Sequence, residues 1–132
     1  MTFLVIIARA AGFLGVLAII VLSLVPGALR PHTGLPGEAE HFLAYCLTAF
    51  ALALGFRPAV YRLGLALGLT LLAGSMEIFQ HFVPGRHPAI ADAIASSMGG
   101  LLGLALGSLL FELAAQVFKK RRPLGDTPGP VQ

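Results

Sequence analysis

The sequence predicts an all-α integral membrane protein, built as a four-helix bundle with both termini in the cytoplasm. Its composition is 57% hydrophobic and only 11% charged, whereas soluble domains carry about 25% charged residues. The mean hydropathy is +0.87. A soluble domain of 132 residues cannot bury that much apolar surface, but a lipid bilayer accepts it. Four apolar stretches and an uneven distribution of Lys and Arg support the same fold class.

The first apolar stretch, residues 10–29, contains no acidic residue or basic residue and is long enough to span a bilayer. The Pro26-Gly27 pair predicts that its helix ends near Val25, and a loop rich in Pro and Gly follows. Arg9 interrupts the apolar run and no basic segment precedes it, so we expect a retained helix rather than a cleaved signal peptide.

The second and third stretches, residues 42–56 and 63–76, supply 15 and 14 uncharged residues, whereas a spanning helix needs about 20. They reach that length by including their neighbours. Arg57 and Arg62 lie at one end and can extend to the headgroups. Short carboxylates cannot reach far, so the polar residues at the other end should face the bundle interior. These residues are Glu40, His41, Glu77, Gln80 and His81.

The fourth stretch, residues 93–111, contains glycines at four-residue spacing, which form a smooth face that another helix can approach closely. We expect Gly99, Gly103 and Gly107 to pack inside the bundle, and the alternative is a homodimer through the same face. The chain therefore divides into a helical membrane domain, residues 1–118, and a basic, Pro- and Gly-rich cytoplasmic tail, residues 119–132, for which we predict disorder.

Lys and Arg predict the orientation, because loops that stay in the cytoplasm are enriched in them. With the N-terminus inside, seven of the nine basic residues are cytoplasmic, and only Arg30 and Arg86 face the other side. Four of the six acidic residues then gather at the extracytoplasmic face. This convergence is the main functional signal in the sequence. The polar residues expected there are Glu38, Glu40, His41, Glu77, Gln80, His81, Arg86, His87, Asp92 and Ser96.

Glu77, Gln80 and His81 are spaced i, i+3 and i+4, which predicts one shared helical face. A carboxylate held there could act as a general acid or base. Because a carboxylate is costly to keep within a membrane helix, a functional role is the expected one. The alternative is a structural hydrogen bond between Glu77 and one of these neighbours. His41 could relay a proton near neutral pH, or it could be an interfacial histidine bound to a loop carbonyl.

Asp92 lies where the fourth helix should begin, a position that favours carboxylates in any helix. A functional role gains weight because Arg86 and Glu77 should lie near it. Arg86 follows a Pro-Gly turn and could bind a phosphate through two hydrogen bonds, or it could form an ion pair that holds the loop. We assign Glu77, His41, Asp92, Gln80 and His81 as candidate catalytic residues, and Arg86, Glu40 and Ser96 as candidate substrate-binding residues.

Four of these side chains, His41, Glu77, His81 and Asp92, offer oxygen or imidazole ligands that suit zinc or manganese. No compact ligand motif accompanies them, so we predict no metal and no other cofactor, with a divalent metal as the alternative.

Two further features of the composition exclude other classes of function. The basic residues are too scattered for a nucleic-acid surface, so we expect no nucleic-acid partner. Cys46 is the single cysteine, which excludes an intrachain disulfide.

Several motifs follow one another along the chain, namely Glu40-His41-Phe42-Leu43-Ala44-Tyr45, Glu77-x-x-Gln80, Val83-Pro84-Gly85-Arg86, Asp92 and the small residues near Gly99. In this order and spacing they resemble the motifs of the VanZ-like proteins of bacteria. The resemblance implies a multi-pass protein of the bacterial cytoplasmic membrane, in a family whose namesake is associated with resistance to the glycopeptide antibiotic teicoplanin. It also implies a relation to membrane enzymes proposed to modify lipids or lipid-linked sugars.

The leading hypothesis is an enzyme that acts on an outer-leaflet lipid or a lipid-linked sugar phosphate, and enzymatic activity itself is left open. The alternative is a non-enzymatic lipid-binding or scaffold protein of the cell envelope that influences glycopeptide sensitivity. A transporter ranks last, because no acidic residue lies at the midplane of a predicted helix, where transport sites are usually found.

Overall fold

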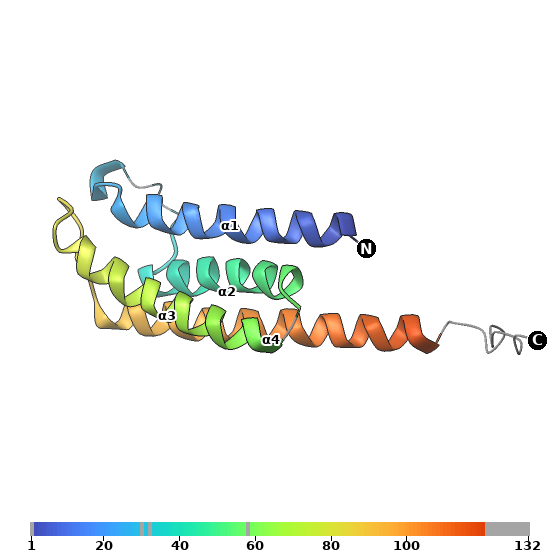
Figure 1. Ribbon diagram of the computed structural model, residues 1–132. Helices are drawn as coiled ribbons and strands as arrows, with labels where there is room; N and C mark the ends of the chain where they lie inside the picture. The colour runs from blue at the N-terminus through green and yellow to red at the C-terminus, as the bar shows by residue number, and fades with distance from the viewer. Residues whose placement is uncertain (1, 30, 32, 58, 121–132) are drawn as a thin grey trace, which may run out of the picture.

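The computed structural model describes residues 2–29, 31, 33–57 and 59–120, and these residues form helices and no strand. Consecutive helices run in opposite directions and lie side by side (Figure 1). The predicted all-α class is therefore confirmed. The α-helices are α1 (Thr2–Leu24), α2 (Gly37–Gly55), α3 (Ala59–Gln80) and α4 (Ile90–Lys120), and a short 3-10 helix, η1 (Gly27–Leu29), follows α1.

Three of these helices are long and apolar enough to cross a membrane, over Phe3–Leu24 in α1, Val60–Gln80 in α3 and Ile90–Val117 in α4. Their outer surfaces expose many large apolar side chains, which is the pattern expected for contact with lipid. The shorter α2 is not among them, and its first turn contains Glu38 and Glu40. A fourth crossing, by α2, therefore stays a prediction.

The core of the structure forms around α2, which lies between α1 and α4 and contacts both (Figure 1). Among the described residues, the backbones of α1 and α4 do not approach each other closely. One face of α2 buries side chains at helical spacing, from Tyr45 through Ala49 to Leu52. They pack against residues contributed by the other three helices, namely Ile19, Leu69, Ala73 and Leu104.

Glycines on α4 bring its backbone against that of α2. A Cβ atom added at Gly99 would lie 2.2 Å from the carbonyl oxygen of Phe42, and one at Gly103 would lie 2.1 Å from that of Cys46. Both distances are far shorter than van der Waals contact, so these positions require glycine. Gly107 lies against α2 in the same way. A second copy of the chain would have to displace α2 to use this face for a homodimer.

The helices are longer than the uncharged stretches of the sequence, because their charged residues have partners. Arg9 lies inside α1, where its Nε donates a hydrogen bond of 2.9 Å to the carbonyl oxygen of Gly55. Arg62 lies inside α3 and pairs with Glu112 of α4 at 3.3 Å. At its other end, α4 includes residues 119 and 120 of the predicted tail. The remainder of that tail, residues 121–132, lies outside the described residues.

The two loops at one end of the bundle are tied to each other. The backbone N–H of Gly27 donates a hydrogen bond of 3.1 Å to the carbonyl oxygen of Pro84. A Cβ at Gly27 would lie 2.0 Å from the carbonyl oxygen of Gly85, which itself has a φ of +73°. Glycine is therefore required at both positions. The contact fixes the α1–α2 loop against the α3–α4 loop, at the end where the polar residues gather.

Candidate functional site

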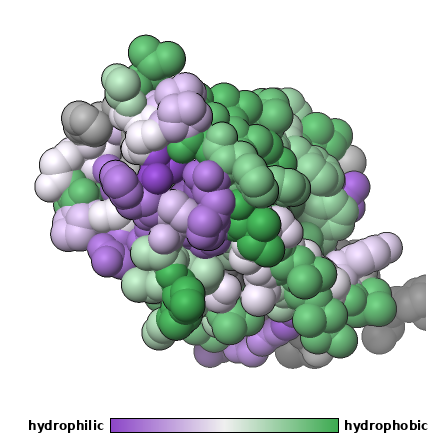
Figure 2. Space-filling view, turned by 90° about the vertical axis from the view of Figure 1, so that its left-hand side faces the viewer, coloured by the Kyte–Doolittle hydropathy of each residue, from purple (hydrophilic) through white to green (hydrophobic). Residues whose placement is uncertain are grey.

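Polar side chains from three helices meet at the end of the bundle that carries these two loops. His41 comes from α2, Glu77 from α3, and Asp92 and Ser96 from the start of α4. We call these four residues the polar cluster. Figure 2 looks onto this end and shows hydrophilic side chains gathered in one patch, with apolar surface directly beside it. The predicted convergence of α2, α3 and α4 residues is therefore present in the fold.

Within the polar cluster, three residues bring their ligand atoms close together. A ring nitrogen of His41 and one carboxylate oxygen each of Glu77 and Asp92 all lie within 4.8 Å of one another. His41 Nε2 is 3.9 Å from Asp92 Oδ2, and His41 Nδ1 is 3.4 Å from the hydroxyl oxygen of Ser96. Both ring nitrogens thus face a polar group of α4, and this arrangement orients the imidazole.

Glu77 has a structural contact as well as a place in the cluster. Its side chain is buried, with 8% of the residue exposed, and Oε2 accepts a hydrogen bond of 3.0 Å from the backbone N–H of Ala89. Because Ala89 directly precedes α4, the carboxylate satisfies a backbone donor at the start of that helix. Glu77 therefore links the end of α3 to the beginning of α4.

Gln80, one turn after Glu77, is the last residue of α3 and is only 3% exposed. Its side-chain nitrogen is buried and has no hydrogen-bond partner in the protein. Leaving a buried donor unpaired costs about 1–3 kcal/mol. A bound oxygen atom would remove that cost, so the amide is suited to hold a substrate group or an ordered water molecule.

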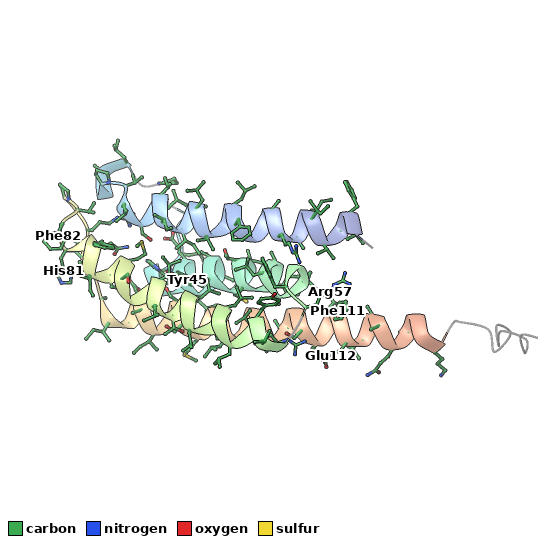
Figure 3. All side chains as sticks on the ribbon, in the orientation of Figure 1. Tyr45, Arg57, His81, Phe82, Phe111 and Glu112 are labelled. Atoms are coloured by element: carbon green, nitrogen blue, oxygen red, sulfur yellow. The ribbon has the colours of Figure 1, made fainter. Side chains whose placement is uncertain are left out.

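His81 does not join the polar cluster. The helix ends at Gln80, and His81 is exposed in the turn that follows, at the tip of the bundle (Figure 3). Its Nδ1 donates a hydrogen bond of 3.0 Å to the backbone carbonyl oxygen of Glu77, not to the carboxylate. The helical face predicted for these three residues therefore holds for Glu77 and Gln80 alone.

Arg86 holds the α3–α4 loop to the end of α1. Its Nε donates a hydrogen bond of 3.0 Å to the carbonyl oxygen of Val25, and a terminal nitrogen donates to the carbonyl oxygen of Leu22. The last carbonyl groups of a helix carry partial negative charge, so a guanidinium is favourable there. The role of Arg86 in phosphate binding stays a prediction.

The other two predicted substrate-binding residues also have contacts within the protein. Glu40 accepts a hydrogen bond from the hydroxyl group of Thr33, which ties the α1–α2 loop to the first turn of α2. Ser96 is 1% exposed and reaches His41 rather than open space. In this arrangement Ser96 orients the imidazole, and its role in substrate binding stays a prediction.

Three residues of the polar cluster could hold a divalent cation. His41 offers an imidazole nitrogen, and Glu77 and Asp92 offer carboxylate oxygens, a set that suits zinc or manganese with further positions left for water or substrate. In a tetrahedral site such ligands lie about 2.0–2.2 Å from zinc, so neighbouring ligand atoms are about 3.3–3.6 Å apart. The three atoms lie within 4.8 Å of one another, so the side chains would have to move closer together to hold an ion. The predicted absence of a metal stays a prediction.

Tyr45 is a residue of the site region to which the sequence analysis gave no role of its own. It lies one turn after His41 on α2, is 1% exposed, and is within electrostatic range of Glu77. The sequence does contain a signal for Tyr45, because its i, i+4 spacing from His41 places the two residues on one face of a helix. No such signal exists for Thr33 or Ala89, because their contacts depend on how the loops fold.

Comparisons of the chain with protein-family models, with curated proteins and with solved structures found no match. Fold and site together define an all-helical protein with three helices able to cross a membrane and a partly buried polar cluster at one end of its bundle. The resemblance to VanZ-like proteins rests on the motifs of the sequence.

Proposed function

We propose that the protein is a VanZ-like enzyme of the bacterial cytoplasmic membrane that acts on an outer-leaflet lipid or a lipid-linked sugar phosphate. The observation that carries the proposal is the meeting of His41, Glu77 and Asp92, from three different helices, within 4.8 Å of one another. Ionisable residues near a membrane are costly to bury and usually serve a function. An imidazole between two carboxylates is suited to proton transfer.

In the proposed arrangement α2 is the fourth crossing of a four-helix bundle, and both termini are cytoplasmic. Arg9, Arg57 and Arg62 support this orientation, because they lie at the end of the bundle opposite to the polar cluster. Figure 3 shows Arg57 and His81 at opposite ends of the helices. Basic residues favour the cytoplasmic side, so the polar cluster faces the outer leaflet, with apolar surface beside it for a lipid tail (Figure 2).

In the proposed mechanism, Glu77 acts as general base or acid on the headgroup of the lipid. His41 relays the proton, and Asp92, 3.9 Å from Nε2, keeps the imidazole oriented. Such acid–base catalysis contributes about 10²–10⁴-fold to a rate. The unpaired amide nitrogen of Gln80 binds an oxygen of the headgroup. The α3–α4 loop, held by Arg86, forms the outer wall of the site.

Comparative lipid mass spectrometry tests the proposal. A deletion strain would be complemented with wild type, with Glu77→Gln, or with the control Glu112→Gln, at matched protein levels. Glutamine keeps an acceptor for the Ala89 N–H and removes the proton-transfer group. Glu112 is an exposed carboxylate at the opposite end, so its loss should cost little. We expect a lipid species that changes with wild type and with Glu112→Gln but not with Glu77→Gln.

Identical lipid profiles in all strains, including polyprenyl-linked species, would count against the enzyme. They would favour the second candidate, a non-enzymatic lipid-binding or scaffold protein. A specific observation supports that candidate, since Glu77 and Glu40 each make a contact that joins loop and helix. If Glu77→Gln depletes or unfolds the protein, the cluster is structural and the scaffold function gains support.

A further inference from the structure

A second feature lies at the opposite end of the bundle, where the backbones of α1 and α4 lie apart. The space between them forms an apolar groove of about 880 Å³, closed on one side by the last turns of α2. Binding sites for small molecules commonly have volumes of about 300–1,000 Å³. Along α1 the groove extends from Leu4 to Ala11. This is about 10 Å at 1.5 Å per residue, which fits within one leaflet, about 15 Å of hydrocarbon.

One charged residue, Arg57, lines this groove. Its guanidinium carbon lies 4.6 Å from the centre of the Phe111 ring, a cation–π contact, and Figure 3 shows both side chains at this end of the bundle. The Nε atom of Arg57 is buried and has no hydrogen-bond partner. Among the described residues, no carboxylate forms an ion pair with Arg57. Arg57 is half-buried, so its positive charge and its unpaired Nε–H favour a negatively charged ligand, and none of these side chains supplies one.

The surroundings of the groove are also basic. Arg9 lies beside it, over the ring of Phe56, and Lys120 ends α4 beyond it. Basic residues at a membrane surface attract anionic lipids. An acyl chain would contact the apolar walls of the groove, and a phosphate group would contact the guanidinium of Arg57. The charge and the apolar walls therefore match the two parts of one molecule, an anionic phospholipid.

We propose that this groove binds one anionic phospholipid, with an acyl chain between α1 and α4 and the headgroup phosphate on the guanidinium of Arg57. The site lies at the end of the bundle opposite to His41, Glu77 and Asp92. It therefore does not depend on the proposed enzyme and places the lipid in the other leaflet.

The sequence contains no Trp, so Phe111→Trp introduces a single tryptophan, which can be excited selectively, into the groove. Tryptophan also keeps an aromatic ring facing Arg57. The protein would be reconstituted into phosphatidylcholine vesicles that contain brominated phosphatidylglycerol or brominated phosphatidylcholine as quencher. We expect about five-fold stronger quenching per molecule of brominated phosphatidylglycerol, which corresponds to about 1 kcal/mol for one basic residue near the membrane surface.

In the same background, Arg57→Gln should remove this preference, whereas Arg62→Gln should keep it. Arg62 is the matched control, because it lies at the same end and its removal changes the charge equally, but it pairs with Glu112 and does not line the groove. Should Arg57→Gln fail to fold, native mass spectrometry of the unaltered protein provides the second measurement. We then expect one retained phosphatidylglycerol per chain and no retained phosphatidylcholine.

Three results would overturn the proposal. Equal quenching by the two lipids, or equal retention of both, would show that the groove accepts lipid without selecting a headgroup. A preference that survives Arg57→Gln would place the anion elsewhere. The absence of quenching by either lipid would show that protein, such as a second copy of the chain, covers the groove.

Discussion

At the scale of single residues, the side chains of the polar cluster combine structural and chemical demands. His41 is held by two groups of α4, and Glu77 satisfies the backbone of the loop that precedes the same helix. Removing a hydrogen-bond acceptor and removing a charge are therefore different experiments at position 77. Substitutions that keep one property and remove the other can separate folding from function.

We predict that Glu77→Leu destabilises the protein by about 1–3 kcal/mol, because it leaves the Ala89 N–H buried without its acceptor. Glu77→Gln keeps that acceptor, and we expect its free energy of unfolding to stay within about 1 kcal/mol of wild type. Thermal unfolding in detergent micelles, followed by circular dichroism, compares the two variants. Equal losses of stability would show that the hydrogen bond to Ala89 does not hold the loop.

At the scale of the secondary-structure elements, two kinds of contact hold the helices together. Glycines let α4 approach the backbone of α2, and polar side chains at both ends join α3 to its neighbours. In a bilayer, close packing and hydrogen bonds drive helix association, since lipid tails are as apolar as leucine side chains. The α2–α4 contact should therefore be sensitive to a single added methyl group.

We predict that Gly103→Ala destabilises the bundle by about 1–3 kcal/mol, the usual cost of overfilling a packed interior. The added Cβ would lie 2.1 Å from the carbonyl oxygen of Cys46. Gly68→Ala in α3 is the control, because no atom lies within 4 Å of its added Cβ, and it should not destabilise. The midpoints of thermal unfolding, recorded in the same detergent, compare the stabilities of the two variants. A harmless Gly103→Ala would contradict the close α2–α4 contact.

We also predict that Arg86→Gln weakens the attachment of the α3–α4 loop to α1. Its Nε donates to Val25, and a hydrogen bond to a charged group contributes about 1.5–3 kcal/mol. Arg62→Gln breaks an exposed ion pair and should cost less than about 1 kcal/mol. Limited proteolysis of the loop in detergent, together with thermal unfolding, measures the difference. Equal rates of loop cleavage and equal unfolding midpoints in the two variants would mean that Arg86 does not hold the loop.

The sequence was sufficient to predict the helices and their alternating directions, because the length of each apolar stretch can be read from hydropathy. The uncharged stretches begin after Arg9 and after Arg62, whereas both arginines lie inside helices, where Gly55 and Glu112 are their partners. The meeting of His41, Glu77 and Asp92 followed from topology. The contacts of Arg86 did not, because its partners are backbone carbonyl groups of α1, which no pattern of side chains indicates.

At the scale of the whole molecule, the two ends of the bundle differ in chemistry. One end holds an imidazole with one buried and one half-buried carboxylate, and the other holds arginines around an apolar groove. This asymmetry underlies the proposed orientation, in which each end meets a different leaflet. A direct measurement of topology therefore tests the framework shared by both proposals.

We predict that Leu35→Cys, in the α1–α2 loop, reacts with a membrane-impermeant thiol reagent in intact cells. Val60→Cys, at the start of α3, should react after the cells are permeabilised and not before. Both positions are exposed, with fractions of 50% and 76%. The variants would carry Cys46→Ser, so that each protein has one thiol. The reverse pattern of labelling would invert the orientation and move the polar cluster to the cytoplasmic leaflet.

The close contact between α2 and α4 bears on how the chain is synthesised. The ribosome makes α2 early, yet the helix that approaches its backbone most closely, α4, emerges last. Acidic residues in the first turn of α2 oppose its insertion into the membrane. Until α4 is made, the face of α2 that packs against α4 also has no partner. We expect nascent chains that stop before Ile90 to hold α2 loosely and to be degraded. The bundle would then reach its stable fold only when α4 has been synthesised and has packed against α2.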